Sequence, residues 1–193
     1  MKISVVIPCY NEEQNLEIPV TETIRYFKEN KIPGEVVIVD DGSFDNTRKV
    51  AEKLSVSNPE IKVISHKNNR GLGQACLTGF LNARGKWVTW VPGDGQLYPE
   101  DMINMCNSAD GVEFAIGMVP ITERLVSDNL WRFVLSKSWR LIIKGLLRFD
   151  VNDIVGYAFR RKLLSNITLI SSTGFLNLEF PIKAIKSGVK VKY

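Results

Sequence analysis

One carboxylate between two glycines is the residue in this sequence most clearly placed to do chemistry. Asp94 lies between Gly93 and Gly95 at the end of the apolar run 88–91, and the amide of Gln96 follows two residues later. Glycines let bulky anions approach the backbone, and carboxylate and amide oxygens suit hard divalent cations. The pattern indicates a site for a metal ion and a phosphate. An ordinary strand-to-helix turn capped by Asp94 is the alternative interpretation.

The segments around Asp94 alternate between two patterns. Short apolar runs predict strands, and the segments between them predict helices. The predicted strands cover residues 3–7, 35–39, 61–65, 86–91 and 112–117, and the predicted helices cover residues 11–30, 45–56, 71–83 and 99–107. This alternation favours the α/β class, with a mostly parallel sheet flanked by helices.

Polar residues gather where each of the first four predicted strands ends. In sheets of this kind, ligands bind beyond the carboxyl ends of the strands. We therefore expect these residues to form one shared site. They are Tyr10, Asn11 and Glu12 after the first strand, Asp40 and Asp41 after the second, residues 69–71 after the third, and Asp94 with Gln96 after the fourth.

Composition excludes several classes of protein. The 193 residues, 45% hydrophobic and 24% charged, are typical of one soluble globular domain. No apolar run approaches the roughly 20 residues of a membrane-spanning helix, and the first residues do not resemble a signal peptide. Three cysteines without metal-like spacing predict reduced, structural thiols in the cytosol. The single histidine, His66, gives little support to histidine metal sites or a Ser-His-Asp triad.

The glycine-rich piece at Gly71 and Gly73 does not indicate a familiar nucleotide fold. It follows the third predicted strand, and Cys76 stands where a third glycine of a dinucleotide fingerprint would be. The chain also has no P-loop ending in Gly-Lys-Ser/Thr. Neither a redox Rossmann domain nor an ordinary NTPase is therefore favoured.

Four segments, in the same order and spacing, resemble the family 2 glycosyltransferases of the GT-A fold. They are residues 4–16 (SVVIPCYNEEQNL), 37–47 (VIVDDGSFDNT), 68–80 (NNRGLGQACLTGF) and 91–101 (VPGDGQLYPED). Within that family the chain is most similar to the dolichyl/polyprenyl-phosphate sugar synthase branch. The resemblance implies a single domain, in which residues 1–117 bind a nucleotide-diphosphate sugar and residues 118–193 bind the acceptor. Related chains usually continue past Tyr193.

The resemblance also implies roles for the residues at the strand ends. It places four residues at the nucleoside, one acid near the base or ribose, the glycine-rich piece by the nucleotide, and one acid and one amide at the diphosphate and its Mg²⁺ or Mn²⁺. In that order they are Pro8, Tyr10, Asn11 and Glu12; Asp40; Gly71, Gly73 and Gln74; and Asp94 with Gln96. Asp41, next to Asp40, is a further candidate for binding the donor.

One departure from the family pattern affects the metal. The family usually has Asp-x-Asp at the fourth strand, and here Pro92 occupies the first Asp position. Mg²⁺ commonly takes few protein ligands and keeps water and phosphate oxygens, so Asp94, Gln96 and the diphosphate could hold the ion. The alternative is a non-catalytic homologue that only binds the sugar nucleotide.

The second half offers fewer candidates. Asp153 lies three residues before Gly156, as in an Asp-x-x-Gly pattern of the synthase branch, and we expect it to be a catalytic-site residue; a structural turn Asp is the alternative. Arg160 and Arg161 could meet a phosphate or could form an exposed helix start. Glu179 matches a recurrent acid of the family on a late helix, without a defined role.

Residues 129–149 predict an amphipathic, basic helix. One face is aromatic and aliphatic, and the opposite arc is basic, with Arg132, Lys137, Arg140, Lys144 and Arg148. Such a helix suits the surface of an anionic membrane. A core-packing helix with a solvated basic face is the alternative. No nucleic-acid-binding module accompanies the charge, so we expect no nucleic-acid partner.

Together these features predict an inverting glycosyltransferase that moves a hexose from a UDP- or GDP-sugar to a polyprenyl or dolichyl phosphate. The protein would be cytoplasmic and peripheral to the membrane face. An acceptor phosphate is already ionised and needs no strong general base, whereas a hydroxyl acceptor would need one. An enzyme that makes a cell-surface polysaccharide or glycolipid through a hydroxyl acceptor is the second hypothesis, and a catalytically silent sugar-nucleotide binder is the third.

Overall fold

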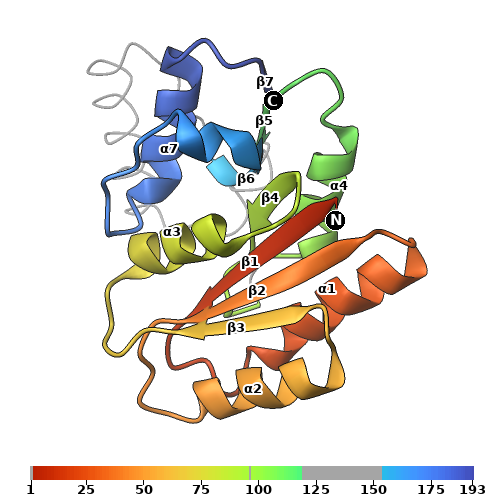
Figure 1. Ribbon diagram of the computed structural model, residues 1–193, viewed down its shortest axis with the longest axis vertical. Coiled ribbons are helices and arrows are strands. Elements are labelled where there is room, and N and C mark those ends of the chain that lie inside the picture. The colour runs from red at the N-terminus through yellow and green to blue at the C-terminus, as the bar shows by residue number, and fades with distance from the viewer. Residues whose placement is uncertain (1, 96, 119–153) are drawn as a thin grey trace, which may run out of the picture.

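The computed structural model describes residues 2–95, 97–118 and 154–193, which build one seven-stranded sheet with helices on both faces (Figure 1). The strands are β1 (Ile3–Cys9), β2 (Gly34–Asp40), β3 (Ile61–Ser65), β4 (Trp87–Trp90), β5 (Phe114–Met118), β6 (Ile154–Arg160) and β7 (Val191–Lys192). The helices are α1 (Glu17–Glu29), α2 (Thr47–Ser57), α3 (Leu72–Asn82), α4 (Pro99–Ser108), the 3₁₀ helix η1 (Arg161–Ser165) and α7 (Leu176–Lys186).

The sheet has the strand order β3-β2-β1-β4-β6-β5-β7 and is mostly parallel, as predicted. Strands β3, β2, β1 and β4 run in one direction, and β6 runs antiparallel to both β4 and β5. Because β6 is reversed, its first residue, Ile154, lies at the edge where β4 and β5 end. That edge also carries the loops singled out from the sequence.

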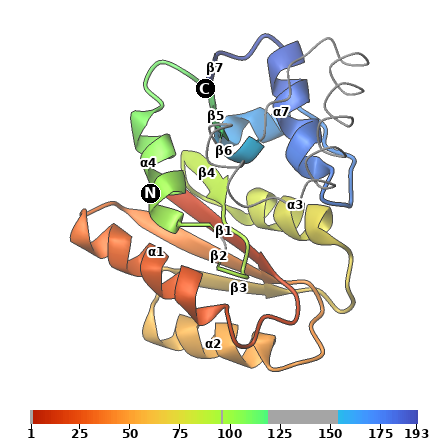
Figure 2. The same cartoon turned by 180° about the vertical axis from the view of Figure 1, so that it is seen from behind.

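Two layers of helices cover the sheet (Figures 1 and 2). Helices α1, α2 and α4 pack on one face, and α3, η1 and α7 pack on the other. Val36 and Ile38 of β2 face the first layer, whereas Val37 and Val39 face the second, and all four are fully buried. Burial on both faces explains why the strand is a continuous apolar run rather than an alternating one.

Aromatic rings hold the second layer onto the sheet. The ring of Phe159 in β6 lies 5.1 Å from that of Phe80 in α3 and 4.6 Å from that of Phe180 in α7, measured between centroids. Edge-to-face pairs at such distances add to the stability gained by burial. The C-terminal helix α7 is therefore tied through β6 to the helix that follows the glycine-rich loop.

The predicted boundaries agree with the structure to within two residues, except at the start of the first helix. Residues 11–30 were expected to be helical, but α1 begins at Glu17, and Asn11 has a φ of 56°. The backbone amides of Asn11 and Glu12 instead donate to Ser43 Oγ (3.0 Å) and Thr47 Oγ1 (2.8 Å). The left-handed backbone of Asn11 cannot belong to a right-handed helix, and these contacts hold residues 11 and 12 against the β2–α2 loop and the first residue of α2.

The structure also bears on the predictions about the cysteines and about membrane-spanning helices. The three cysteines are buried and unpaired, which confirms the prediction of structural thiols. Among the described helices, none combines the length and the apolar character that crossing a bilayer requires. The predicted amphipathic helix at residues 129–149 lies outside the described residues.

Candidate functional site

A pocket of about 340 Å³ opens at the edge of the sheet where the parallel strands end. Four separate loops contribute to it, which is the convergence expected from the polar strand ends. Its lining comprises Pro8 and Cys9 at the end of β1, Tyr10 and Glu12 after it, Asp41 after β2, Asn69, Gly71, Leu72 and Ala75 around the start of α3, and Pro92, Gly93 and Asp94 after β4.

Asp94 is held at the pocket by the backbone next to it. The amide of Val91 donates to Val6 O (2.9 Å) and that of Gly93 donates to Pro8 O (3.1 Å), so the turn after β4 lies against the end of β1. A Cβ at Gly93 would lie 2.8 Å from the Cβ of Cys9, and Gly95 has a φ of +75°. Both glycines are therefore required by the path of the turn that presents Asp94.

The loop after β1 is locked to the loop after β2. The side chain of Asn11 accepts the amide of Phe44 (2.9 Å), and Glu13 Oε2 accepts the amide of Asn46 (2.8 Å). Tyr10, 37% exposed at the pocket rim, packs edge-on against Phe44 with a centroid distance of 6.1 Å. Asn11 thus acts as a loop clamp and does not line the pocket.

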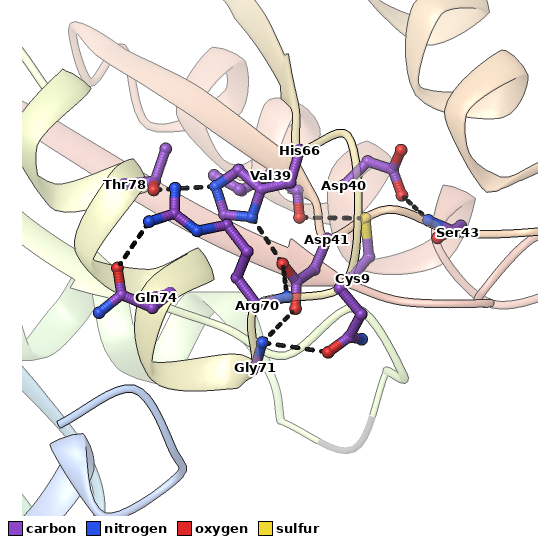
Figure 3. Close-up of polar contacts among 11 residues, drawn as sticks. Cys9, Val39, Asp40, Asp41, Ser43, His66, Arg70, Gly71, Gln74 and Thr78 are labelled. Carbon is purple, nitrogen blue, oxygen red and sulfur yellow. Dashed lines mark hydrogen bonds and ion pairs between the residues drawn. The ribbon is translucent and has the colours of Figure 1, made fainter.

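The two acids at the end of β2, Asp40 in the strand and Asp41 just after it, face different ways. Asp40 is buried and its Oδ1 accepts the amide of Ser43 (3.1 Å), so it shapes the β2–α2 loop and does not line the pocket. Asp41 lines the pocket and accepts the amides of Arg70 (3.0 Å) and Gly71 (2.8 Å), as Figure 3 shows. Of the two predicted acids, the structure therefore brings Asp41 to Asp94.

The glycine-rich piece divides between the pocket and a neighbouring loop. Gly71 lines the pocket, yet a Cβ there would lie 2.6 Å from Ser172 O, and a Cβ at Gly73 would lie 2.4 Å from Thr173 O. Gly73 does not line the pocket, so its glycine character is explained by the close approach of the segment before α7. Gln74 lies outside the lining as well, and its Oε1 accepts from Arg70 Nη2 (3.4 Å).

Glu179 holds that neighbouring segment in place. Its two carboxylate oxygens accept the amides of Ile170 (2.9 Å) and Ser171 (2.8 Å), and Lys183 Nζ donates to its Oε1 (2.6 Å). Burial opposes ionisation of Glu179, but the hydrogen bonds from Lys183 and the two amides outweigh it and lower the pKa of the carboxyl. Glu179 therefore fixes the loop on which Gly71 and Gly73 rest.

The pocket is acidic. Its described lining contains the carboxylates of Glu12, Asp41 and Asp94 and no Lys or Arg. Burial raises the pKa of the Cys9 thiol, and the carboxylate of Asp40 raises it further, so Cys9 stays protonated and is no nucleophile. No group of three or more potential metal-ligating His, Cys, Asp or Glu side chains occurs in the described part of the chain.

Arg160 and Arg161 lie far from this pocket. Arg160 pairs with Trp87 at the opposite end of β4, and its guanidinium stacks 4.5 Å from the Trp87 ring centroid. Both arginines line a separate hollow of about 860 Å³ at that edge, and Arg161 opens η1 as the exposed helix start considered above. Gln96 and Asp153 lie outside the described residues.

A mostly parallel α/β sheet, with a pocket at the edge where its central strands end, is the arrangement in which α/β nucleotide-binding domains hold their ligands. The sequence matches the family described as Glycosyl transferase family 2 over residues 4–168. The chain belongs to this family, which confirms the family and the enzyme class predicted from the motifs.

Curated relatives come from the predicted branch. The chain is 32% identical over 198 residues to a polyprenol monophosphomannose synthase of Mycolicibacterium smegmatis, covering 97% of this chain and 73% of the relative. It is also 32% identical to a dolichyl-phosphate beta-glucosyltransferase of Mus musculus, covering 75% of this chain and 51% of the relative. The chain therefore spans only about half the length of some of the relatives it matches.

Solved structures share the fold. A mannosyltransferase from Pyrobaculum calidifontis in complex with GDP-Man and Mn²⁺ superimposes with a TM-score of 0.67 at 18% identity, covering 99% of this chain and 54% of that one. A glucosyl-3-phosphoglycerate synthase from Mycobacterium tuberculosis, in complex with Mn²⁺, UDP and phosphoglyceric acid, gives 0.66 at 19%, covering 97% and 65%. These likenesses confirm the predicted GT-A fold.

Proposed function

We propose that this protein transfers a hexose, with inversion, from a nucleotide-diphosphate sugar to a polyprenyl or dolichyl phosphate. The observation that carries the proposal is that Asp94 shares one pocket with Tyr10 and Asp41, residues from three separate strand ends. The names of the curated relatives supply the substrate class, because they act on polyprenol, undecaprenyl phosphate or dolichyl phosphate.

A divalent ion, Mg²⁺ or Mn²⁺, belongs to this proposal because of the charge of the pocket. A nucleoside diphosphate is strongly anionic, and the described lining offers three carboxylates and no cationic side chain to meet it. Asp94 fits the ion, with Gln96 proposed beside it, since such ions often take one or two protein ligands and complete their shell with phosphate and water oxygens. When bound, the ion would neutralise charge on the leaving diphosphate.

The proposed reaction is a direct displacement at the anomeric carbon. An oxygen of the acceptor phosphate forms the new bond to that carbon, and the bond to the nucleoside diphosphate oxygen breaks with its electron pair. Because the acceptor is already an anion, the chain needs a residue that positions it rather than a strong base. We propose Asp153, which directly precedes β6 in the sequence, as a further residue of the catalytic site, and we assign Asp94 to the side where the bond to the diphosphate breaks.

The acceptor half, residues 118–193, is proposed to meet the membrane surface through residues 129–149. The apolar face and basic arc of that segment support the proposal. Changing both Trp131 and Trp139 to Ser should weaken co-sedimentation with liposomes that contain anionic lipid. Unchanged co-sedimentation would remove the membrane contact from the proposal and leave the transfer reaction standing.

Transfer is tested with purified protein, Mn²⁺, polyprenyl phosphate and radiolabelled UDP- or GDP-sugars. We expect radiolabel to move into the organic phase only when the lipid phosphate is present, and a thermal-shift screen of the same sugar nucleotides identifies the base, because bound ligand raises the melting temperature. Label that appears in a water-soluble glycan would favour the hydroxyl-acceptor enzyme instead. Stabilisation by a sugar nucleotide without any transfer or hydrolysis would favour the silent binder, for which Pro92 is the supporting feature.

A further inference from the structure

His66, the only histidine of the chain, lies just behind the pocket and does not line it. It follows β3, and its side chain is 6% exposed. Its Nδ1 lies 2.6 Å from Asp41 Oδ1, and its Nε2 lies 2.9 Å from Thr78 Oγ1 on α3, as Figure 3 shows. The imidazole therefore joins a pocket-lining carboxylate to a helix of the second layer.

Asp41 is the centre of this arrangement. Its Oδ1 accepts from His66 and from the amide of Arg70, and its Oδ2 accepts the amide of Gly71. Its side chain is 4% exposed, so each of these hydrogen bonds replaces one that water would otherwise make. The Gly71 amide is shared with Asn69 Oδ1 (3.1 Å), so the Asp41 carboxylate, together with Asn69, holds the loop that carries Asn69 and Gly71 into the pocket.

The partners of His66 define its proton arrangement. A carboxylate only accepts hydrogen bonds, so the contact with Asp41 requires a proton on Nδ1. The hydroxyl of Thr78 can donate to Nε2 of the neutral ring, and both contacts are then satisfied. The Asp41 carboxylate therefore selects the tautomer of His66, and the Thr78 hydroxyl, which can either donate or accept, satisfies the other ring nitrogen.

We propose that His66 is a positioning residue of the donor site. By donating from Nδ1 it keeps the Asp41 carboxylate in the orientation that holds the Arg70 and Gly71 amides, so that the loop is formed before the donor arrives. This inference rests on the proposed function, in which the pocket takes a nucleoside diphosphate. A loop that must be ordered during binding weakens affinity, so the contribution of His66 belongs to donor binding rather than to the displacement step.

Two substitutions at His66 separate its two nitrogens. The amide nitrogen of Asn is two bonds from Cβ, as Nδ1 is, and that of Gln is three bonds from Cβ, as Nε2 is. His66→Asn therefore keeps a donor for Asp41, whereas His66→Gln keeps a partner for Thr78 and loses Asp41. Titrations with UDP and with GDP, each with Mn²⁺, should show donor affinity within about threefold of wild type for His66→Asn and roughly 10–100-fold weaker for His66→Gln.

Kinetics and a packing control complete the test. In His66→Gln the KM for the sugar nucleotide should rise while kcat at saturating donor stays unchanged. Thr78→Val removes the other hydrogen bond of the ring at nearly constant volume and should leave donor affinity close to wild type. Equal losses of affinity in His66→Asn, His66→Gln and Thr78→Val would show that the ring only fills space, and would overturn the proposal.

A measurement on the free protein keeps this proposal separable from the proposed function. Because the chain has one histidine, ¹⁵N-labelled imidazole should give a single pair of signals, with Nδ1 protonated in wild type and the two tautomers mixed in Asp41→Asn. Amide exchange at Arg70 and Gly71 should be faster in His66→Gln than in His66→Asn. Mixed tautomers in the wild type, or equal exchange in the two variants, would refute the hydrogen bond by which His66 positions Asp41, even if nucleotides bind. If that hydrogen bond is intact in a protein that binds no nucleotide, the proposed function and the donor role of His66 are both refuted.

Discussion

The Cα hydrogen of Gly73 points at the backbone of the segment before α7, and a Cβ in its place would lie 2.4 Å from Thr173 O. The same added atom would lie 2.8 Å from Ser171 O. Glu179 fixes this segment from the other side through the amides of Ile170 and Ser171. The glycine-rich motif of the first half therefore forms the surface on which a loop of the second half packs.

Gly73→Ala should move this loop and destabilise the protein. Backbone atoms cannot swing away as a side chain can, so we expect the overpacking to cost about 1–3 kcal/mol and to lower Tm by several degrees. Gly174→Ala is the matched control, because a Cβ there meets only Leu72 Cδ2 at 3.9 Å. Thermal unfolding of both variants provides the measurement, and equal Tm values for the two would contradict the packing argument.

The order of strands and helices could be predicted because local patterns determine it. Residues 36–39 are buried on both faces of the sheet, and this burial requires a continuous apolar run. That run was enough to predict the strand from the sequence. The antiparallel position of β6 could not be predicted, because its partners β4 and β5 are distant in the sequence and the pairing is a tertiary choice. The predicted start of α1 was wrong for a similar reason, since Asn11 takes a left-handed backbone conformation and its amide and that of Glu12 are held by Ser43 and Thr47, which are distant in the sequence.

The sequence predicted correctly which loops meet at the pocket, but it predicted less accurately which of their side chains line it. Both Asp40 and Asp41 were candidates, and only Asp41 lines the pocket. Strand alternation contained the answer, because Asp41 continues the parity of Val37 and Val39, which face α3. His66 had no such signal, because the role proposed for it depends on Asp41 and Thr78, which folding brings to it from the end of another strand and from a helix.

Replacing Asp94 by Asn should abolish most of the transfer activity without unfolding the protein. The amide keeps the shape of the side chain but removes the charge proposed to hold the divalent ion, so we expect a loss of about 100-fold or more in kcat/KM. Glu100→Gln is the control, since Glu100 is an exposed acid in the first turn of α4 that does not line the pocket. Activity is measured by lipid extraction of radiolabel. Normal turnover in Asp94→Asn would remove Asp94 from the metal and diphosphate site.

Pro92→Asp should raise the affinity for nucleotide when Mn²⁺ is present and lower it when Mn²⁺ is absent. Pro92 lines the pocket with Asp94, so an added carboxylate would restore the Asp-x-Asp pattern usual in the family. With Mn²⁺ we expect UDP or GDP to bind roughly tenfold more tightly, because a second carboxylate can share the ion. Without it, a fourth acid in the lining should weaken binding by repulsion. Calorimetric titration of Pro92→Asp against the uncharged Pro92→Asn tests this, and identical behaviour of the two would argue against an ion at this position.

Glu35 should make the stability of the protein sensitive to acid. Its side chain is fully buried, where it accepts Ser4 Oγ and the amide of Arg84, both at 2.6 Å, and pairs with the Arg84 guanidinium at 2.9 Å. Burial opposes ionisation, but these hydrogen bonds and the charge of Arg84 outweigh it and lower the pKa of Glu35.

Because the folded state prefers ionised Glu35, its contribution is fully present above the unfolded pKa of about 4.3 and is lost as the pH falls through the lower folded value. Glu35→Gln should therefore lower Tm at pH 7, and the gap to wild type should narrow below about pH 4. Glu52→Gln, which removes an exposed pair with Arg48, should shift Tm little at either pH. Thermal unfolding between pH 3 and pH 7 gives the comparison. A gap that stays constant over this range would mean that the Glu35 contacts stabilise the fold without any preference for the ionised carboxylate.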